Sequence, residues 1–238
     1  MAMITLTQRR PFLVSLCLFF FAPAAGSVLL RAQPPSKGLY LGARLGWCRL
    51  DTPTVRDRPG AGLLGFRRDT FCWAVASGYQ WDSGKGVGLG LEAGYADNGA
   101  AAVTYASANE YEFGSTQIDF LGTVSLPLPG GIMAYGKGGV ARAREEYRLS
   151  RFVSGTPDID SHKTRALPVL AAGLGYRLTG RLRLGAEFRH LFGDASHAIS
   201  KALQSTNPNP PPYQDVLSSV ARVNSLSAGI TCTLGKAR

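Results

Sequence analysis

The sequence lacks any apolar run long enough to cross a membrane as a helix, for which about 20 consecutive apolar residues are needed. The longest uninterrupted run, from Phe12 to Phe21, is much shorter. Two arginines precede it and small residues follow it, which is the order found in a secretory signal peptide. We therefore expect residues 1–32 to be a signal peptide and residues 33–238 to form the mature chain. Cleavage could follow Ala24, Gly26 or Ala32.

Histidines are also scarce, and no metal or nucleotide motif is present. The chain has three histidines, of which His162 and His197 show no metal-ligand spacing. The glycine-rich run at 84–90 contains a Gly-Lys pair, but neither serine nor threonine follows that pair as a phosphate-binding loop requires. We expect no catalytic residues, no metal and no cofactor.

The basic residues do not form the single stripe, interleaved with aromatics, that is typical of nucleic-acid binding. They are scattered, although the net charge is +10. We therefore expect no nucleic-acid partner. For an exported basic protein the more plausible polyanion is the phosphate of lipopolysaccharide, which arginine binds in a bidentate manner.

What the sequence does contain is strict alternation of two residue classes, seen most clearly from Gly86 to Tyr95. Every second residue there is apolar, and those between are glycine or Glu92. Successive side chains of a strand point to opposite faces, so one face is apolar and the other carries a charge. A membrane-spanning barrel provides lipid for the first face and a polar lumen for the second.

Eight segments share this period of two, and long connections alternate with short ones between them. That alternation is typical of outer-membrane barrels, with short periplasmic turns and four long external loops. We predict an all-β fold, an eight-stranded antiparallel up-and-down transmembrane barrel, with both termini in the periplasm. The segments are 38–50, 69–81, 86–95, 115–126, 132–143, 167–178, 181–192 and 222–234.

The two faces can be assigned strand by strand. In 38–50 the residues Leu39, Leu41 and Leu45 share one face, while Arg44 lies on the face that carries the glycines. Aromatic residues such as Trp47 and Tyr176 fall at strand ends, where the membrane interfaces would lie. Eight strands enclose a narrow interior, so we expect polar side chains to fill the lumen.

Four stretches carry a family resemblance. They are G-L-Y-L-G-A-R-L-G-W at 38–47, S-G-Y-Q followed by G-L-E-A-G-Y between 77 and 95, P-V-L-A-A-G-L-G-Y at 168–176, and L-S-A-G-I at 226–230. In order and spacing they resemble the transmembrane domain of the outer membrane protein A (OmpA) family, across essentially the whole mature chain. The resemblance implies a barrel whose lumen holds a charge network that can switch partners and admit small solutes. Because the sequence ends at Arg238, we expect no periplasmic peptidoglycan-binding domain.

The family's interior charges match Arg44, Glu92, Lys137 and Glu187 of this chain. Thr123, Gly175 and Gly185 stand where the family has further charges, so the pairing within the network is open. Arg183 and Arg189, which lie on the same inward face, could substitute for the family's missing charges. The predicted lumen charge network is Arg44, Glu92, Asp119, Lys137, Arg183, Glu187 and Arg189.

An enzyme that modifies lipid A is the alternative function. Phe188-Arg189-His190 resembles the start of a lipid A deacylase signature, in which a nucleophilic serine follows the histidine by two residues. Here that position is Phe192, and Ser196 lies in the following loop. Without a serine to activate, we expect His190 to be a residue of the barrel rim.

The four cysteines allow one disulfide in the barrel. Cys48 and Cys72 lie on the lumen side near the outer ends of two adjacent strands, in an oxidising compartment. Their Cα atoms must lie about 4.4 to 6.8 Å apart for a bond to form. We predict that they are bonded and that Cys232 is free on the lipid side.

From these features we expect a non-enzymatic outer-membrane protein, monomeric, that supports envelope integrity and displays its external loops. Its partners would be outer-membrane lipid and lipopolysaccharide, together with host or cell-surface ligands of those loops. At most a small gated conductance is expected.

Overall fold

A computed structural model describes the barrel and parts of its connections. The described residues are 37–51, 63–83, 86–105, 110–151, 161–194, 198–202, 213–217 and 219–234. The predicted signal peptide, Ser196 and His197 lie outside them. Within this part of the chain, no helix has the length and apolar character that crossing a membrane requires.

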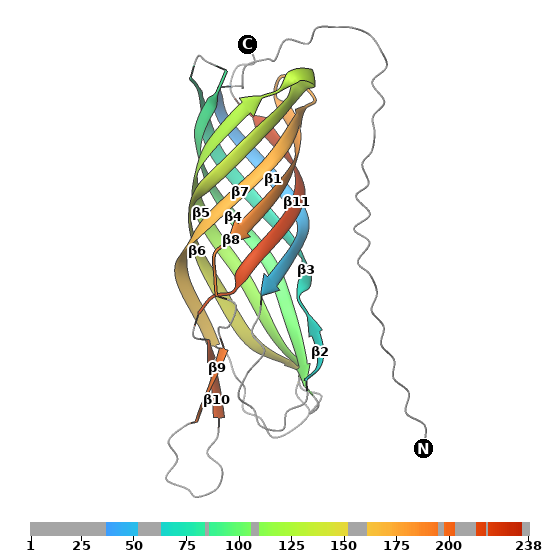
Figure 1. The fold of residues 1–238 in the computed structure, drawn as a ribbon, viewed down its shortest axis with the longest axis vertical. Coiled ribbons are helices and arrows are strands. Elements are labelled where there is room, and N and C mark those ends of the chain that lie inside the picture. Colours follow the sequence, from blue (N-terminus) through green and yellow to red (C-terminus); the bar gives the residue numbers. More distant parts are fainter. Residues whose placement is uncertain are drawn as a thin grey trace, which may run out of the picture.

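Eight antiparallel strands close into a barrel (Figure 1), as the period of two predicts. Around the ring the order is β4-β3-β1-β11-β8-β7-β6-β5, and pairing of β5 with β4 closes it. Their bounds are β1 Gly38–Asp51, β3 Asp69–Asp82, β4 Gly88–Tyr105, β5 Glu110–Pro127, β6 Ile132–Arg151, β7 Ser161–Arg177, β8 Leu182–Leu191 and β11 Arg222–Thr233.

The outer wall of the barrel is apolar because one face of every strand points away from the lumen. Trp47 is 72% exposed, Phe120 67% and Leu226 61%, which would be unfavourable in water over so large a surface. Asp119, next to Phe120 in sequence, points inward and is buried. Lipid is the solvent that suits this belt.

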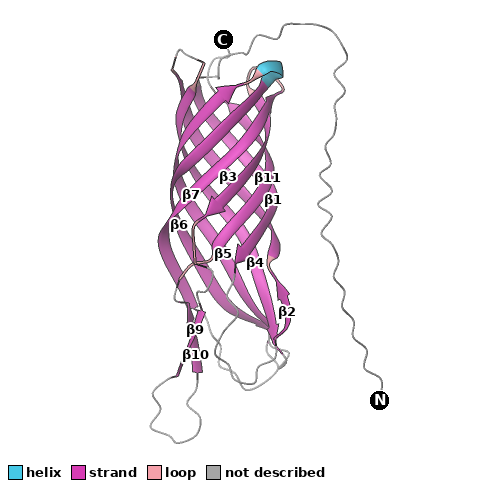
Figure 2. Cartoon of the chain, viewed as in Figure 1, coloured by secondary structure: helices cyan, strands magenta, loops and turns pink. Residues whose placement is uncertain are grey.

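The two ends of the barrel differ. At one end the connections are tight, and Pro129–Gly131 forms a single 3-10 turn, the only helical element among the described residues (Figure 2). Gly130 and Gly131 have φ of 77° and 78°, a conformation that favours glycine. At the other end the connections are long. These are called below the short-turn end and the long-connection end.

At the long-connection end, four strands continue well past the predicted segments. β4 and β5 have 18 residues each, β6 has 20 and β7 has 17, whereas a tilted strand needs only about 9 to 11 to cross a bilayer. They form a raised wall to which β2 (Leu63–Arg67) adds by pairing with β4. The hairpin of β9 (Ala198–Ala202) and β10 (Tyr213–Leu217) lies at the same end (Figure 1). The sequence analysis predicted none of these additions.

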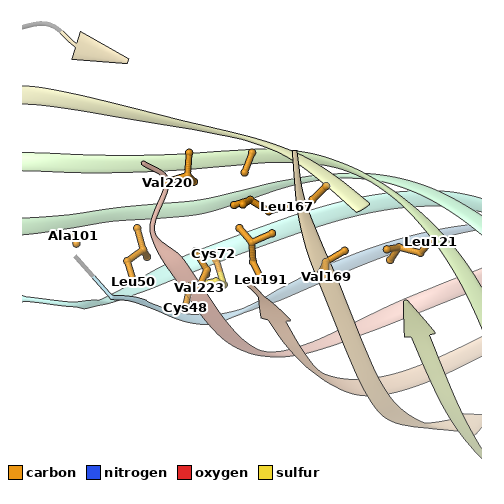
Figure 3. Close-up of a cluster of buried hydrophobic side chains, with 12 residues drawn as sticks. Cys48, Leu50, Cys72, Ala101, Leu121, Leu167, Val169, Leu191, Val220 and Val223 are labelled. Atoms are coloured by element: carbon orange, nitrogen blue, oxygen red, sulfur yellow. A yellow bond between two sulfur atoms is a disulfide. The ribbon is translucent and has the colours of Figure 1, made fainter. Parts of the chain in front are cut away.

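The outer half of the lumen is filled by apolar side chains (Figure 3). The expectation that polar side chains fill the lumen is therefore wrong for this half. The physical reason is that burying hydrocarbon favours folding by about 25 cal/mol per Å². The members of this outer apolar cluster are Cys48, Leu50, Cys72, Ala101, Leu121, Ala141, Ala143, Leu167, Val169, Leu191, Val220 and Val223.

A short segment before β11 lies across this cluster. Val220 is fully buried within it, and the amide of Ala221 donates to Glu145 Oε2 at 2.6 Å. Arg165 Nη1 lies 2.9 Å from Ser219 Oγ and 3.1 Å from Asp194 Oδ2. Backbone pairing between Asp194 and Ala221 holds the segment in place, so residues 219–221 cover the apolar cluster from the long-connection end.

Candidate functional site

Buried charges from five strands meet in the middle of the lumen. Each lies on the inward face of its strand, as the alternation of the sequence predicts. The set is called here the lumen charge cluster. It consists of Arg44 on β1, Glu92 on β4, Asp119 on β5, Lys137 on β6, and Glu187 and Arg189 on β8.

Glu92 and Glu187 are each shared between cations. Lys137 Nζ lies 2.8 Å from Glu92 Oε2 and 2.9 Å from Glu187 Oε2. Arg44 Nη1 lies 2.7 Å from Glu187 Oε2 and 3.7 Å from Glu92 Oε1. The hydroxyl of Tyr40 also donates to Glu92, at 2.9 Å. Each carboxylate therefore bridges opposite walls of the barrel.

Arg189 extends the cluster toward the long-connection end. Its guanidinium contacts Glu187 Oε1 at 3.2 Å and forms an ion pair with Asp119. Gln117 Nε2 donates to Asp119 Oδ2 at 3.2 Å, and Asn98 Nδ2 donates in turn to Gln117 Oε1 at 3.3 Å. Hydrogen bonding thus continues up to the outer apolar cluster.

The cluster is electrically neutral and almost fully buried. It has three cations and three carboxylates, with side-chain exposures between 1% and 13%. Buried charges persist only when paired, and removal of one partner typically costs about 3 to 5 kcal/mol. Two of its atoms, Arg44 Nη2 and Asp119 Oδ1, are buried without a hydrogen-bond partner among the described residues. The cluster therefore has one donor and one acceptor that could enter another pairing.

Glycines make room for these long side chains. A Cβ added at Gly229 would lie 2.5 Å from Arg44 Cγ, and one at Gly94 would lie 2.7 Å from Asp119 Oδ1. Both contacts are too close for a real Cβ. The alternation of glycine with apolar residues is thus explained by the packing of the lumen and not by a phosphate-binding loop.

Two small cavities flank the cluster. The larger, of about 60 Å³, lies on the side of the short-turn end and reaches Glu92 and Lys137. The smaller, of about 20 Å³, lies toward the long-connection end beside Arg189 and the cysteines. Arg44 borders both, so the cluster is the partition between two solvent-sized spaces.

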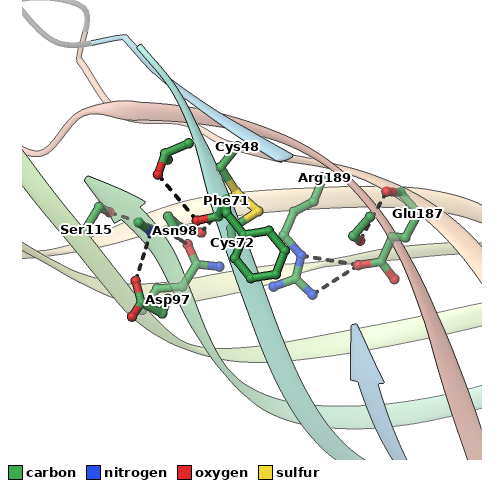
Figure 4. Close-up of a disulfide and its surroundings, with 12 residues drawn as sticks. Cys48, Phe71, Cys72, Asp97, Asn98, Ser115, Glu187 and Arg189 are labelled. Atoms are coloured by element: carbon green, nitrogen blue, oxygen red, sulfur yellow. Dashed lines mark hydrogen bonds and ion pairs between the residues drawn. A yellow bond between two sulfur atoms is a disulfide. The ribbon is translucent and has the colours of Figure 1, made fainter. Parts of the chain in front are cut away.

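The structure joins Cys48 and Cys72 in a disulfide beside this partition (Figure 4), with Cα atoms 5.7 Å apart. The bond links β1 to β3 at the base of the outer apolar cluster. Cys232 is free and points outward from β11.

We expect thiol counting on the unfolded, non-reduced mature protein to find one reactive thiol, that of Cys232, because a disulfide removes the other two. A Cys232→Ser variant should then give none. Three reactive thiols in the wild-type chain would contradict the disulfide.

Six of the seven predicted network residues come together in the cluster. The seventh, Arg183, points into the lumen but lies nearer the short-turn end, beside the larger cavity and outside the cluster. Sequence reasoning missed Tyr40, Gln117 and Asn98 as hydrogen-bonding members. The alternating pattern places these three residues on the inward face, but neutral side chains there give no signal comparable to that of a charged side chain.

His190 lies on the outward face of β8, as expected for a rim residue. Its Nδ1 is 2.7 Å from Asn224 Oδ1, and its ring packs edge-on against Phe192 at 4.3 Å. Among the described residues, no serine hydroxyl hydrogen-bonds to this imidazole. The serine-based chemistry of the alternative function has no support in this arrangement.

Comparison with known proteins gives one family match and several relatives. Residues 34–220 match the model of the OmpA-like transmembrane domain. Outer membrane protein P5 of Haemophilus influenzae is 27% identical over 177 residues, which cover 71% of this chain and 49% of that protein. The same protein from strain Rd is 26% identical over 219 residues, covering 90% and 58%. The chain thus spans about half the length of the curated relatives it matches.

Solved barrels resemble it as well. Neisserial surface protein A (NspA) gives a TM-score of 0.47 at 14% identity, covering 83% of this chain and 97% of that one. The attachment invasion locus protein Ail of Yersinia pestis, solved with the heparin analogue sucrose octasulfate, gives 0.45 at 10% identity, covering 82% and 99%.

Proposed function

The chain belongs to the OmpA-like transmembrane domain family, and on that premise we propose that it is a non-enzymatic barrel with a structural role in the envelope and a lumen gated by its charge cluster. It is a β-barrel protein of the bacterial outer membrane. The short-turn end then faces the periplasm and the long-connection end faces the exterior. We expect it to act as a monomer, because the eight strands close on themselves and leave no unpaired edge in the ring.

The proposal of a gate rests on the position of the neutral charge cluster between two cavities. In the state that the structure describes, the lumen is closed twice, by the charge cluster in the middle and by the outer apolar cluster above it. Opening requires that Arg44 or Arg189 exchange carboxylate partners and that the apolar side chains part. Arg44 Nη2 and Asp119 Oδ1, which have no hydrogen-bond partner among the described residues, are the atoms that new pairings would use.

The outward face of β6 supports contact with lipopolysaccharide. Val140, which is 53% exposed, ends the apolar stretch, and Arg142, Arg144 and Arg148 follow on the same face. This is the depth at which the phosphates of lipid A would lie. Glu146 lies among these arginines and pairs with Arg144 and Arg148, so the face keeps a net positive charge. Guanidinium groups bind phosphate strongly and in a bidentate manner, so these arginines would anchor the barrel in the outer leaflet.

The raised wall supports a surface-interaction role. The described ends of β4 to β7 form this wall and extend well beyond the apolar belt. Inside the wall, the rings of Phe113 and Tyr147 pack together with centroids 4.7 Å apart. A rigid wall of this kind holds the attached connections at a fixed height above the membrane. A host or cell-surface ligand would meet this part of the protein first.

Mass spectrometry of lipid A separates the structural role from the enzymatic alternative. We expect lipid A from cells with and without the gene to carry the same acyl chains, because no serine hydroxyl hydrogen-bonds to His190 in the described part of the chain. A His190→Ala variant should also leave lipid A unchanged. A change in acylation that appears with the wild-type gene and disappears with this variant would refute the non-enzymatic function.

A further inference from the structure

One inward-facing cation of the lumen has no carboxylate partner among the described residues. Arg183 lies on the inward face of β8 near the periplasmic end and borders the larger cavity. Among the residues that the structure describes, Arg183 forms neither an ion pair nor a hydrogen bond. Directly across the β7–β8 register stands another cation, Arg177, which does have contacts of its own.

No carboxylate of the lumen charge cluster is left over for Arg183. The three cluster carboxylates already balance Arg44, Lys137 and Arg189. Glu92 borders the same cavity, but its two oxygens accept hydrogen bonds from Lys137 and Tyr40. A cation that is partly removed from water in a narrow lumen costs free energy unless a counter-charge approaches it.

The walls of the cavity hold Arg183 in position and supply further hydrogen-bonding groups. Its stem lies across Gly175, where an added Cβ would be 2.7 Å from Arg183 Cδ. The hydroxyls of Thr123 and Thr231 line the same space. The cavity measures about 60 Å³, whereas one water needs about 10 to 15 Å³ on this measure. It can therefore hold a small ion together with water.

We propose that the periplasm-facing cavity is a binding site for a small oxyanion of the phosphate type, with Arg183 as its main ligand. A guanidinium group offers two parallel N–H donors to an oxyanion, and hydroxyl donors complete the set. The site lies on the periplasmic side of the gate, so it can be occupied while the lumen is closed. It goes beyond the proposed function and does not depend on conduction.

The test uses inorganic phosphate and the refolded mature protein in a neutral maltoside detergent free of phospholipid. Isothermal titration calorimetry should show binding that chloride at equal ionic strength does not reproduce. Arg183→Gln should bind phosphate about 10- to 100-fold more weakly, because a hydrogen-bonded charged group contributes about 1.5 to 3 kcal/mol. Arg181→Gln is the matched control, since Arg181 is exposed at the same end outside the cavity, and it should bind like the wild type.

A second variant keeps the arginine and supplies it with a competing carboxylate. Gly175→Glu would push the Arg183 stem aside, because its Cβ would lie 2.7 Å from Arg183 Cδ, and would bring a carboxylate next to the guanidinium. It should abolish phosphate binding, and heat-modifiable gel mobility shows whether the barrel has folded. The proposal is overturned if the wild-type protein does not bind phosphate, or if Arg183→Gln or Gly175→Glu binds it unchanged. Nanodiscs of phosphatidylcholine, with and without phosphatidylglycerol, identify the source of the anion. Equal affinities support a free oxyanion, whereas loss of binding with phosphatidylglycerol would show that a lipid headgroup occupies the site instead.

Discussion

Replacement of Glu92 by alanine is expected to lower the free energy of unfolding in micelles by about 3 to 5 kcal/mol, the usual cost of removing one partner from a buried ion pair. Lys137 would lose both of its hydrogen bonds to this carboxylate, at 2.9 and 2.8 Å, and Tyr40 would lose its acceptor. The cluster would then hold three cations against two carboxylates. Urea unfolding followed by tryptophan fluorescence measures the loss.

Glu146→Ala is the matched control for this prediction. Glu146 also forms ion pairs with two cations, Arg144 and Arg148, but these are 52% and 63% exposed and lie outside the lumen. Exposed pairs contribute about 0 to 1 kcal/mol. If the two alanine variants had equal stability, the lumen charge cluster would not be the buried, paired network described above.

Replacement of Leu191 by alanine is expected to lower the free energy of unfolding by about 2 to 5 kcal/mol, as for other large-to-small changes in a packed interior. Leu191 is 1% exposed and belongs to the outer apolar cluster. The wall around it is stiffened by the disulfide and by the barrel itself, so the cavity left behind would collapse only partly. The same urea titration measures this effect.

Leu170→Ala separates burial in the lumen from contact with lipid. Leu170 is 54% exposed on the outward face of β7, where micelle hydrocarbon can replace the lost methyl groups. Its substitution should therefore cost clearly less than that of Leu191. A larger loss for Leu170 than for Leu191 would contradict a packed apolar interior at this end of the barrel.

The strands and their faces could be predicted because each strand separates two environments. Arg44, Glu92 and Lys137 could not lie in lipid without a cost of several kcal/mol. Their positions in the alternating pattern therefore identify the inward face of each strand. The closed ring and six residues of the charge cluster follow from that pattern. Family resemblance added the expectation that the charges meet one another.

The outer half of the barrel could not be predicted in this way. Val169 and Leu191 point inward, yet they are as apolar as the outward residues beside them, so the pattern does not distinguish lumen from lipid there. β4 to β7 continue above the membrane, where neither face is in lipid and the alternation weakens. Arg183 lies on the same inward face as the cluster, but its position along β8 separates it from the carboxylates. Alternation predicts which face a residue occupies and does not predict how far along the barrel it lies.

Single-channel recording in planar bilayers tests most directly whether the charge cluster and the outer apolar cluster close the lumen together. The wild-type barrel should show no more than rare, small openings. Glu92→Ala should alter the single-channel current, and the combined Glu92→Ala and Leu191→Ala variant should open more often than either single variant because both barriers are weakened. A steady, large current through the wild-type protein, or identical currents through all four proteins, would contradict the account.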